Sequence, residues 1–342
     1  MADHYPEDVT KMTDRTCRDF TCVGSATEDV FVSVPDAHLF RVEDRQQEMA
    51  YLALEYGAKI RVGDVHIDTG GGATNTAVTF ARMGLKTGIV TKIGVDGPGD
   101  RVIAGMGRDG IETGGVVRDT EHRTGYSVII TGFTGDRTIL VYRGASAFLR
   151  ESEIDWDYLA RTSWVYMNSM AGETAAVFPR ILEFCGERGI HVALNPGKEQ
   201  RALGMAGLAP YLRNVTLLVC NRSEAYEITG VPPDRGPGDE ERMLKMLLDA
   251  GCANVVLTYG SEGSEGMNAS GHWKVPVIEG PVVSTVGAGD AFAAACAVGL
   301  HRGLGLGQAM RIGTANAASV VQVLGAKNGI LTWEQAQAAL QG

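Results

Sequence analysis

A glycine-rich stretch near the C-terminus places an acid where an anion could bind. The segment 282–290 reads VVSTVGAGD, and an alanine-rich run from Ala291 to Leu300 follows it. The β-branched residues predict a strand, the glycines a turn and the alanine-rich run a helix. A helix start has unpaired N–H groups and a positive dipole end, which favour an anion. Asp290 would repel that anion, so its position suits a base that takes a proton from a hydroxyl attacking phosphorus.

A second interpretation of this stretch needs no chemistry. An Asp in the first turn of a helix is stabilised by the dipole, and the two glycines can simply form the turn. A lone G-x-G-D pattern is better explained in that way. The functional interpretation is favoured here because a second glycine motif, GGGATNTA at 70–77, and several polar residues occur in a matching order.

The two motifs together resemble the signatures of the ribokinase-like (PfkB) carbohydrate kinases. The family's D-T-x-G-A-G-D signature corresponds to STVGAGD at 284–290, and its G-G-x-x-x-N-x-A signature to 70–77. The resemblance covers roughly Thr21 to the C-terminus. It implies an α/β fold, a doubly wound, mainly parallel sheet with helices on both faces and a small β lid. It also implies an N-terminal extension at 1–19 and a kinase domain at 20–342, with lid segments at about 30–67 and 112–143.

The alternation of strand and helix after Trp164 agrees with such a sheet. Strands are predicted at 164–167, 191–195, 215–220 and 254–258, and helices at 173–187, 222–229 and 240–250. Repeated β–α units form parallel sheets, whose ligands bind at the carboxyl ends of the strands. Elsewhere we predict helices at 46–56, 74–83, 307–323 and 332–340, and a hairpin of strands 127–131 and 138–142 around Gly135.

Polar residues follow the predicted strands at the edge where ligands bind. They are Asn195, the pair Asn221 and Glu224, and Thr258 with Gly260 and Gly263. Loops and helix caps explain most residues of this kind, but these share one edge with Asp290. The resemblance implies that Asn195, Asn221 and the Thr258 loop meet ATP. It also implies that Asn221 and Glu224 organise Mg²⁺, acting through water.

The resemblance assigns roles to further residues. Asp290 is the expected base, and the backbone N–H groups of Gly287, Ala288 and Gly289 are expected to stabilise the transferred phosphoryl group. Asp29, Gly71 and Asn75 are the expected contacts to the sugar.

Two further positions bear on the substrate and on a monovalent cation. The segment 142–147 reads YRGASA and resembles the Y-R-x-x-S-A of fructokinases and 2-keto-3-deoxygluconate kinases, so Arg143 is expected to contact the sugar or its carboxylate. The alternative is an exposed strand-end arginine in an ion pair. Ser284 stands where the family usually has the Asp of a monovalent-cation site, and Gly325 lies in the matching loop. A neutral oxygen attracts a cation less than a carboxylate does, so we expect little dependence on potassium.

The composition restricts the partners and the compartment. The chain has 342 residues, 44% hydrophobic and 21% charged, with a net charge of −10. This acidity argues against nucleic acid and anionic membranes as partners. Neither a signal-peptide core nor an apolar run of about eighteen residues is present in the sequence. Six cysteines without a C-x-x-C pair favour reduced, mostly buried thiols in the cytoplasm.

The sequence therefore predicts an ATP-dependent kinase for a hydroxyl of a small sugar or sugar acid, with a homodimer through the lid as a possible assembly. A nucleoside kinase of the same family and a non-catalytic family member remain alternatives. The first would stack a base on apolar lid residues, and the second would have lost the motif residues, all of which are present. A dinucleotide-dependent dehydrogenase would have a G-x-G-x-x-G after the first strand, which this sequence lacks.

Overall fold

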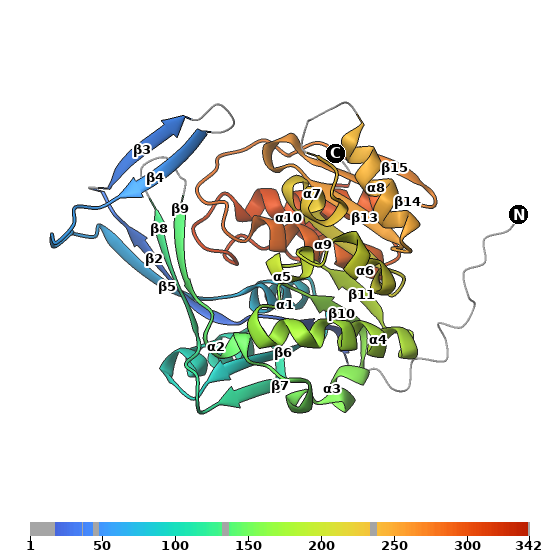
Figure 1. Cartoon of the computed structure of the whole chain (residues 1–342), viewed down its shortest axis with the longest axis horizontal. Helices are drawn as coiled ribbons and strands as arrows, with labels where there is room; N and C mark the ends of the chain where they lie inside the picture. Colours follow the sequence, from blue (N-terminus) through green and yellow to red (C-terminus); the bar gives the residue numbers. More distant parts are fainter. Residues whose placement is uncertain (1–17, 36, 44–47, 132–136, 233–237, 341–342) are drawn as a thin grey trace, which may run out of the picture.

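A large mixed sheet forms the body of the molecule, and a smaller sheet projects from it (Figure 1). The computed structural model describes residues 18–340 except 36, 44–47, 132–136 and 233–237. The main sheet has nine strands in the order β15-β14-β13-β12-β11-β10-β1-β6-β7. In chain order they are β1 (Arg18–Val23), β6 (Thr87–Gly94), β7 (Glu112–Asp119), β10 (Thr162–Met167), β11 (His191–Leu194), β12 (Leu217–Asn221), β13 (Asn254–Thr258), β14 (Ser264–Asn268) and β15 (Gly271–Val275).

The strand order reverses at β1, which fixes where a ligand can bind. The chain runs from β1 to β6 and β7 on one side, and from β10 to β13 on the other. All of these strands are parallel, and only β14 and β15 add antiparallel pairs at one edge. In open sheets of this kind, the crevice at the reversal point lies beside the carboxyl ends of the strands.

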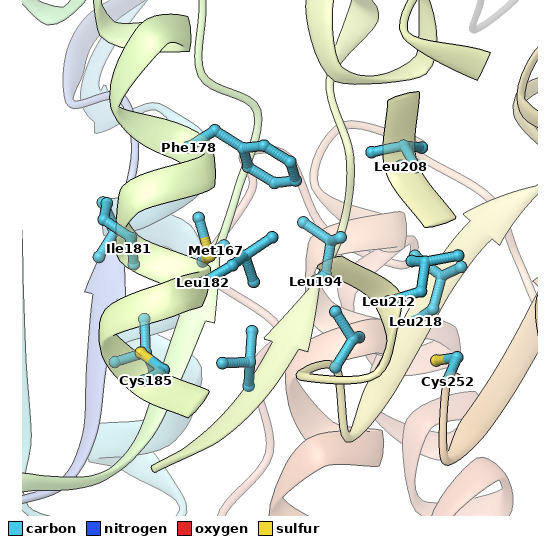
Figure 2. Packing of buried hydrophobic residues seen from close by; sticks show 14 of the residues in the cluster. Met167, Phe178, Ile181, Leu182, Cys185, Leu194, Leu208, Leu212, Leu218 and Cys252 are labelled. Atoms are coloured by element: carbon cyan, nitrogen blue, oxygen red, sulfur yellow. The ribbon is translucent and has the colours of Figure 1, made fainter. Parts of the chain in front are cut away.

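Helices cover both faces because strand side chains alternate between them. Val165 and Met167 join one apolar cluster, whereas Trp164 and Tyr166 join the other. The first face carries α3 (Trp156–Ala160), α4 (Phe178–Arg188), α6 (Gly204–Leu212), α7 (Arg222–Thr229) and α8 (Asp239–Asp249). The second carries α1 (Gly72–Arg82), α9 (Ala288–His301), α10 (Leu306–Val320) and α11 (Trp333–Ala338). Figure 2 shows Phe178, Ile181 and Leu182 of α4 gathered with Met167 and Leu194 from the strands.

The small sheet has four strands in the order β5-β2-β8-β9. They are β2 (Thr27–Ser33), β5 (Asp64–Gly70), β8 (Gly125–Thr131) and β9 (Arg137–Tyr142), and a separate hairpin joins β3 (His38–Glu43) to β4 (Glu48–Ala53). The remaining helices are α2 (Gly97–Arg108), α5 (Lys198–Arg201) and the 3₁₀ turns η2 (Gly144–Ala147), η3 (Glu151–Glu153), η4 (Gly172–Val177) and η5 (Gly260–Glu262). In the parts of the chain described, no helix has the length and apolar character needed to cross a bilayer.

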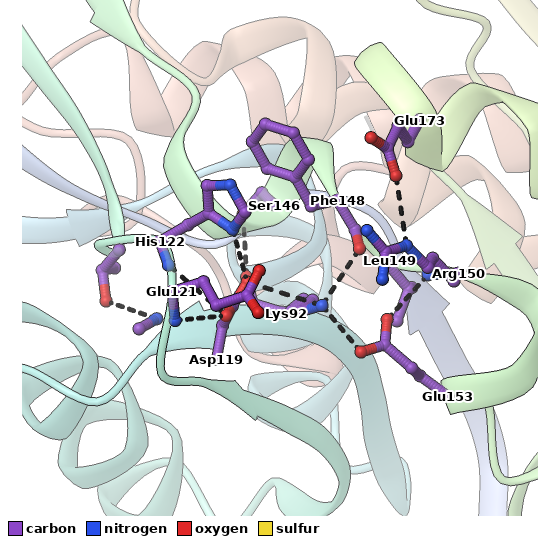
Figure 3. A network of polar contacts seen from close by, with 12 residues as sticks. Lys92, Asp119, Glu121, His122, Ser146, Phe148, Leu149, Arg150, Glu153 and Glu173 are labelled. Atoms are coloured by element: carbon purple, nitrogen blue, oxygen red, sulfur yellow. Dashed lines mark hydrogen bonds and ion pairs between the residues drawn. The ribbon is translucent and has the colours of Figure 1, made fainter.

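A buried polar network ties the small sheet to the main one (Figure 3). The Lys92 ammonium of β6, 6% exposed, lies 2.7 Å from Glu153 Oε1 and 3.4 Å from Asp119 Oδ2, and donates to the Phe148 carbonyl at 3.1 Å. Asp119 also accepts from His122 Nδ1 at 3.0 Å, and the His122 ring stacks on Phe148. The three N–H donors of this ammonium are thus matched by three acceptors. The segments that enter and leave β8 and β9 are therefore held at the edge of the main sheet.

Most predicted elements are confirmed, including the four strands after Trp164 and the β8–β9 hairpin, whose turn lies outside the described residues. The predicted helix at 46–56 is wrong, because its described part pairs with β3 as strand β4. The second lid segment does not begin at 112, because β7 pairs in parallel with β6 in the main sheet. Arg18 and Asp19 belong to β1 and not to the extension; the rest of that extension lies outside the described residues.

Candidate active site

The two glycine motifs meet at the starts of two packed helices. Asn75, the fourth residue of α1, donates from Nδ2 to Asp290 Oδ2 at 2.9 Å, and Asp290 is the third residue of α9. The two residues are 215 positions apart in the sequence. The structure thus brings together Asn75, an expected sugar contact, and Asp290, the expected base.

Desolvation and neighbouring acids raise the pKa of Asp290 to about 6. Loss of solvent around the half-buried carboxyl is the largest cause, and the charges of Asp29 and Glu224 act in the same direction. The hydrogen bond from Asn75 opposes them. A carboxylate with this pKa is mostly ionised near neutral pH, yet it is a stronger proton acceptor than an exposed Asp.

The start of α9 has the open geometry of an anion site. Its N-cap, Gly287, has a φ of 80°, and a Cβ there would lie 2.6 Å from the Ala326 Cβ, so only glycine fits. No side chain caps this helix, and a Cβ built on Gly289 would meet no atom within 4 Å. Backbone N–H groups at such a start are available to a phosphoryl group.

The segment before this turn differs from the prediction. Val282 to Val286 is irregular and not a strand, and Val282 and Val283 are exposed. The N–H groups of Val283 and Ser284 donate to the Val321 carbonyl just after α10. Hydrogen bonding to a helix end has replaced the strand pairing that the β-branched residues suggested.

Asp29 lies in a buried charged cluster on the small sheet. It stands opposite Asp68 of β5 and Ser127 of β8, and its Oδ1 accepts from Thr27 Oγ1 at 2.8 Å. Burial raises the pKa of Asp29, whereas the charge of Lys327 lowers it. The Lys327 ammonium lies 3.5 Å from Asp68 Oδ1 and also contacts Thr69. Sequence reasoning missed Lys327 and Asp68, although Lys327 directly follows the Gly325-Ala326 loop that it had selected.

Gly71 is the N-cap of α1 and has a φ of 92°. A Cβ at this position would lie 2.5 Å from the Ser25 carbonyl oxygen. The same carbonyl accepts from Ala73 N at 3.1 Å, so Gly71 lets α1 begin directly against the β1–β2 connection. The fold therefore requires glycine at position 71, whether or not Gly71 also contacts the substrate as predicted.

The residues predicted to meet ATP lie at the ends of three adjacent parallel strands. Asn195 follows β11 and donates to the Val219 carbonyl at 2.9 Å, and Asn221 stands in register with Thr258. Gly260 is the first residue of the turn η5, which begins two residues after Thr258, and Gly263 follows its last residue. The structure therefore gathers Asn195, Asn221 and the Thr258 loop at one edge.

Asn221 and Glu224 form a reciprocal capping box at the start of α7. Asn221 Oδ1 accepts from Glu224 N and Glu224 Oε2 accepts from Asn221 N, each at 2.9 Å. Arg201 Nη1 donates to the other Glu224 oxygen at 3.1 Å. The described residues include no group of three His, Cys, Asp or Glu side chains placed to hold a metal. Because both Glu224 oxygens are engaged, this pair fits a hydrated Mg²⁺ held mainly by phosphates better than a directly ligated ion.

The structure gives Ser284 and Gly325, the two residues of the expected monovalent-cation site, different neighbours. Ser284 is buried, and its Oγ accepts from Val286 N at 3.3 Å. Gly325 has a φ of 99° and lies beside Asn328 and Asp68.

Arg143 and Arg137 differ in their contacts with the glycine turn. Arg143 is exposed at the start of η2, and no hydrogen bond recorded among the described residues links its side chain to Asp29 or Asp290. Arg137, the first residue of β9, donates to Thr285 Oγ1. Sequence reasoning missed this arginine because nothing in its local sequence shows which loop it reaches.

A cavity of about 850 Å³ contains none of the predicted site residues. Tyr126 and Tyr142 line it from the sheet, together with Asp96, Asp119 and His122. Tyr126 is adjacent to Ser127 and points to the opposite face of β8, and Ser127 is the residue that stands opposite Asp29. The cavity therefore lies on the face of the small sheet away from Asp29.

Comparison with known proteins relates the chain to a family. The model of the "pfkB family carbohydrate kinase" matches residues 40–333. The chain is 28% identical over 273 residues to a bifunctional ribokinase/ribose-5-phosphate isomerase A of Fructilactobacillus sanfranciscensis, covering 78% of this chain and 48% of that protein. It spans about half the length of that relative. A deoxyribokinase of Salmonella typhi is 31% identical over 229 residues, covering 66% of this chain and 72% of the relative.

The structural comparison gives the same fold. The structure of Arabidopsis thaliana ribokinase complexed with ribose and ATP has a TM-score of 0.75 and 20% identity, and the match covers 95% of this chain and 99% of that chain. The main sheet, its two helical layers and the small sheet together form a ribokinase-like fold. With a family model matched over residues 40–333, the chain belongs to the pfkB family of carbohydrate kinases.

Proposed function

We propose that this protein transfers the γ-phosphoryl group of ATP to a hydroxyl of a small sugar or sugar acid, with Asp290 as the general base. The observation that carries this proposal is the Asn75–Asp290 pair beside the uncapped start of α9. The carboxylate accepts a proton there and the helix start binds an anion, which are the two requirements of phosphoryl transfer to an alcohol. Relatives named ribokinase and deoxyribokinase support a sugar as the acceptor.

Each part of the site has a task in this reaction. Asp29, Asn75 and the backbone at Gly71 hold and orient the sugar hydroxyls. Asp290 takes the proton of the attacking hydroxyl, and the N–H groups of Gly287, Ala288 and Gly289 stabilise charge on the transferred group. Asn195, Asn221, Thr258, Gly260 and Gly263 contact the nucleotide. Asn221 and Glu224 would hold Mg²⁺ through water, and the ion would supply positive charge to the phosphates. The small sheet acts as a lid that excludes water, which would otherwise accept the phosphoryl group.

A polar pocket wall favours a sugar over a nucleoside. Asp29, Asp68 and Lys327 present carboxylates and an ammonium to the same region, which suits hydroxyl groups. A nucleoside base would instead be bound by stacking on aromatic or apolar side chains. Arg143 adds a guanidinium that can pair with a sugar carboxylate if it turns inward.

The test is a screen for ADP formation with purified protein. Pentoses, hexoses, keto-deoxy sugar acids and nucleosides are supplied with ATP and Mg²⁺, and Asp290→Asn is the matched inactive control. We expect one sugar or sugar acid to give the highest kcat/KM. A nucleoside as the best substrate would refute the sugar assignment, and equal ADP formation by wild type and variant would refute the base.

The small sheet also supports a homodimer. On its face away from Asp29, Val65, Ile67, Leu140 and Tyr142 are exposed by 50–57%. Apolar side chains gathered on one sheet face are typical of an interface. We expect light scattering to give twice the chain mass, and Leu140→Asp to give a monomer. A wild-type protein that stays monomeric at high concentration would contradict the dimer.

A reducing cytoplasm suits the thiols. The cysteines in the described part of the chain, Cys22, Cys185, Cys220, Cys252 and Cys296, are free and buried. Buried unpaired thiols persist where disulfides are not formed.

A further inference from the structure

A buried tyrosine on the sheet face covered by α1 and α9 has no hydrogen-bond partner of its own within the described structure. Tyr166 of β10 is 1% exposed, and its hydroxyl has no partner within the described structure. Buried tyrosine hydroxyls usually find a partner, because leaving one unpaired is unfavourable. The surroundings otherwise suit phenylalanine, since Phe80 packs at 5.5 Å between ring centroids and Phe20 belongs to the same cluster. Apolar packing therefore does not explain why this position holds tyrosine and not phenylalanine.

The polar groups around Tyr166 belong to the active site. Tyr166 stands in register with Cys22 of β1, and both side chains lie on the face covered by α1 and α9. Cys22 Sγ accepts from Thr76 Oγ1 at 3.4 Å, and Thr76 is the neighbour of Asn75 on α1. The charge of Asp290 raises the pKa of both Tyr166 and Cys22 beyond the effect of burial. Tyr166 therefore lies on the face of the main sheet that packs against α1 and α9, the helices that carry Asn75 and Asp290.

A second unpaired atom in this region complements the hydroxyl. Asn75 is 7% exposed, and while its Nδ2 donates to Asp290, its Oδ1 has no partner in the described structure. Asn75 Oδ1 can accept a hydrogen bond and the Tyr166 hydroxyl can donate one, so each can supply what the other lacks. A buried water molecule between polar groups of this kind is the ordinary way in which proteins satisfy them.

We propose that Tyr166 is a positioning residue, whose hydroxyl holds Asn75 Oδ1 through a buried water molecule and so fixes the amide that orients Asp290. When the water molecule holds Asn75 Oδ1, Asn75 Nδ2 points at the Asp290 carboxylate. The flipped amide, which would place Oδ1 against the carboxylate oxygen, is excluded. Donation to Oδ1 also polarises the amide, so its N–H bonds the ionised carboxylate more strongly. The contact to the carboxyl does not depend on the identity of the substrate, and only its catalytic consequence rests on the proposed function.

The groups that act on Asp290 come from several elements. They are Asn75 from α1, Asp29 from β2, Glu224 from α7, Cys22 from β1 and Tyr166 from β10. Among them only Asn75 stabilises the ionised form by a hydrogen bond. Weakening this bond therefore favours protonation of Asp290.

The experiment compares Tyr166→Phe with the wild type in the free protein, without sugar or nucleotide. The chain is labelled with carboxyl-¹³C aspartate, and the Asp290 signal is assigned from its loss in Asp290→Asn. We expect Tyr166→Phe to raise the proton affinity of Asp290 roughly 3- to 10-fold, about 0.5–1 pKa unit, the effect of one hydrogen bond. Tyr158→Phe is the matched control: it removes a buried hydroxyl that donates to the Glu112 carbonyl at 2.9 Å, at a distance from Asp290, and should leave this titration unchanged.

The thermal stability of the same variants separates the proposal from a structural role. If the Tyr166 hydroxyl were unpaired, Tyr166→Phe would remove an unfavourable group and raise the melting temperature. A bound water predicts an unchanged or lower melting temperature together with the shifted titration. An Asp290 titration that is the same in Tyr166→Phe and wild type, or a melting temperature that rises, would overturn the proposal. A shifted titration in a protein that phosphorylates no sugar would leave it standing and refute the proposed function instead.

Discussion

Replacing Asp290 by Asn should lower kcat by orders of magnitude and at the same time raise the stability of the folded protein. The pKa of Asp290 is raised from 3.8 to about 6, mainly by desolvation. A raised pKa means that the folded state disfavours the ionised form. A shift of about two units corresponds to a free energy on the order of 3 kcal/mol that ionisation removes from folding stability at high pH. The amide introduced by Asp290→Asn would keep an oxygen that accepts from Asn75 and would carry no charge.

The pH dependence fixes the sign of this effect. Below pH 3.8 the carboxyl is protonated in both the folded and the unfolded state, so wild type and variant should be equally stable. Between pH 3.8 and about 6 the folding stability of the wild type falls, because the unfolded state releases the Asp290 proton more readily than the folded state does. Above pH 6 the stability difference between variant and wild type reaches its plateau. At roughly 2 °C per kcal/mol for a chain of this size, Asp290→Asn should melt about 5 °C higher at pH 8.

The assay combines melting curves at several pH values with steady-state kinetics. We expect kcat of the variant to fall by roughly 10²–10⁴, the usual effect of losing a positioned base. In the wild type, kcat should fall about tenfold per pH unit below pH 6, because only the ionised carboxylate accepts the proton. Equal melting temperatures at pH 8 would show that the pKa is not raised. A variant with more than half of the wild-type kcat, with chemistry rate-limiting, would refute Asp290 as the base.

The metal, the monovalent cation and the sugar contact can each be tested at the same site. A chelator should abolish activity and Mg²⁺ should restore it. Glu224→Gln can keep the capping box, and it should raise the Mg²⁺ concentration needed for half activity. An unchanged Mg²⁺ titration in this variant would leave Glu224 only its capping role. Potassium at constant ionic strength should stimulate less than about threefold, because Ser284 offers a neutral oxygen; a larger effect would show that backbone carbonyls suffice. Arg143→Ala should lower kcat/KM for the sugar more than about tenfold, since a hydrogen bond to a charged group contributes about 1.5–3 kcal/mol. Arg123→Ala is the control from the same region. A loss below threefold would show that Arg143 is an exposed residue without a contact to the sugar.

The sequence predicted the elements of the fold that depend on the residues of their own segment. The strands from 162 to 258 alternate regularly with helices, and local periodicity is enough to find them. Residues 46–56 include good helix formers, yet β4 is set by pairing with β3, which propensity does not register. The place of β7 in the main sheet likewise depends on its neighbour β6 and not on its own residues.

The candidate site divides in the same way. Asp290, Gly287 and Asn75 lie in contiguous motifs and were found from them. The surroundings of Lys327 and Tyr166 come from distant parts of the chain. Tyr166 lies in an apolar strand whose sequence indicates only a core position. Its place under α1 and α9 exists only once β1, β10 and the two helices are assembled.

The 215 positions between Asn75 and Asp290 also fix the order in which the parts of the proposed site are synthesised. A ribosome delivers β1, α1 and the small sheet early, and the nucleotide edge later, but the base and the anion-binding turn come only with α9. Lys327, which contacts Thr69 across 258 positions, arrives later still. An incomplete nascent chain can therefore fold much of the main sheet without possessing a phosphoryl-transfer site. In the proposed mechanism, a chain that ends before α9 would hold the sugar contacts Asp29 and Asn75 without the base Asp290.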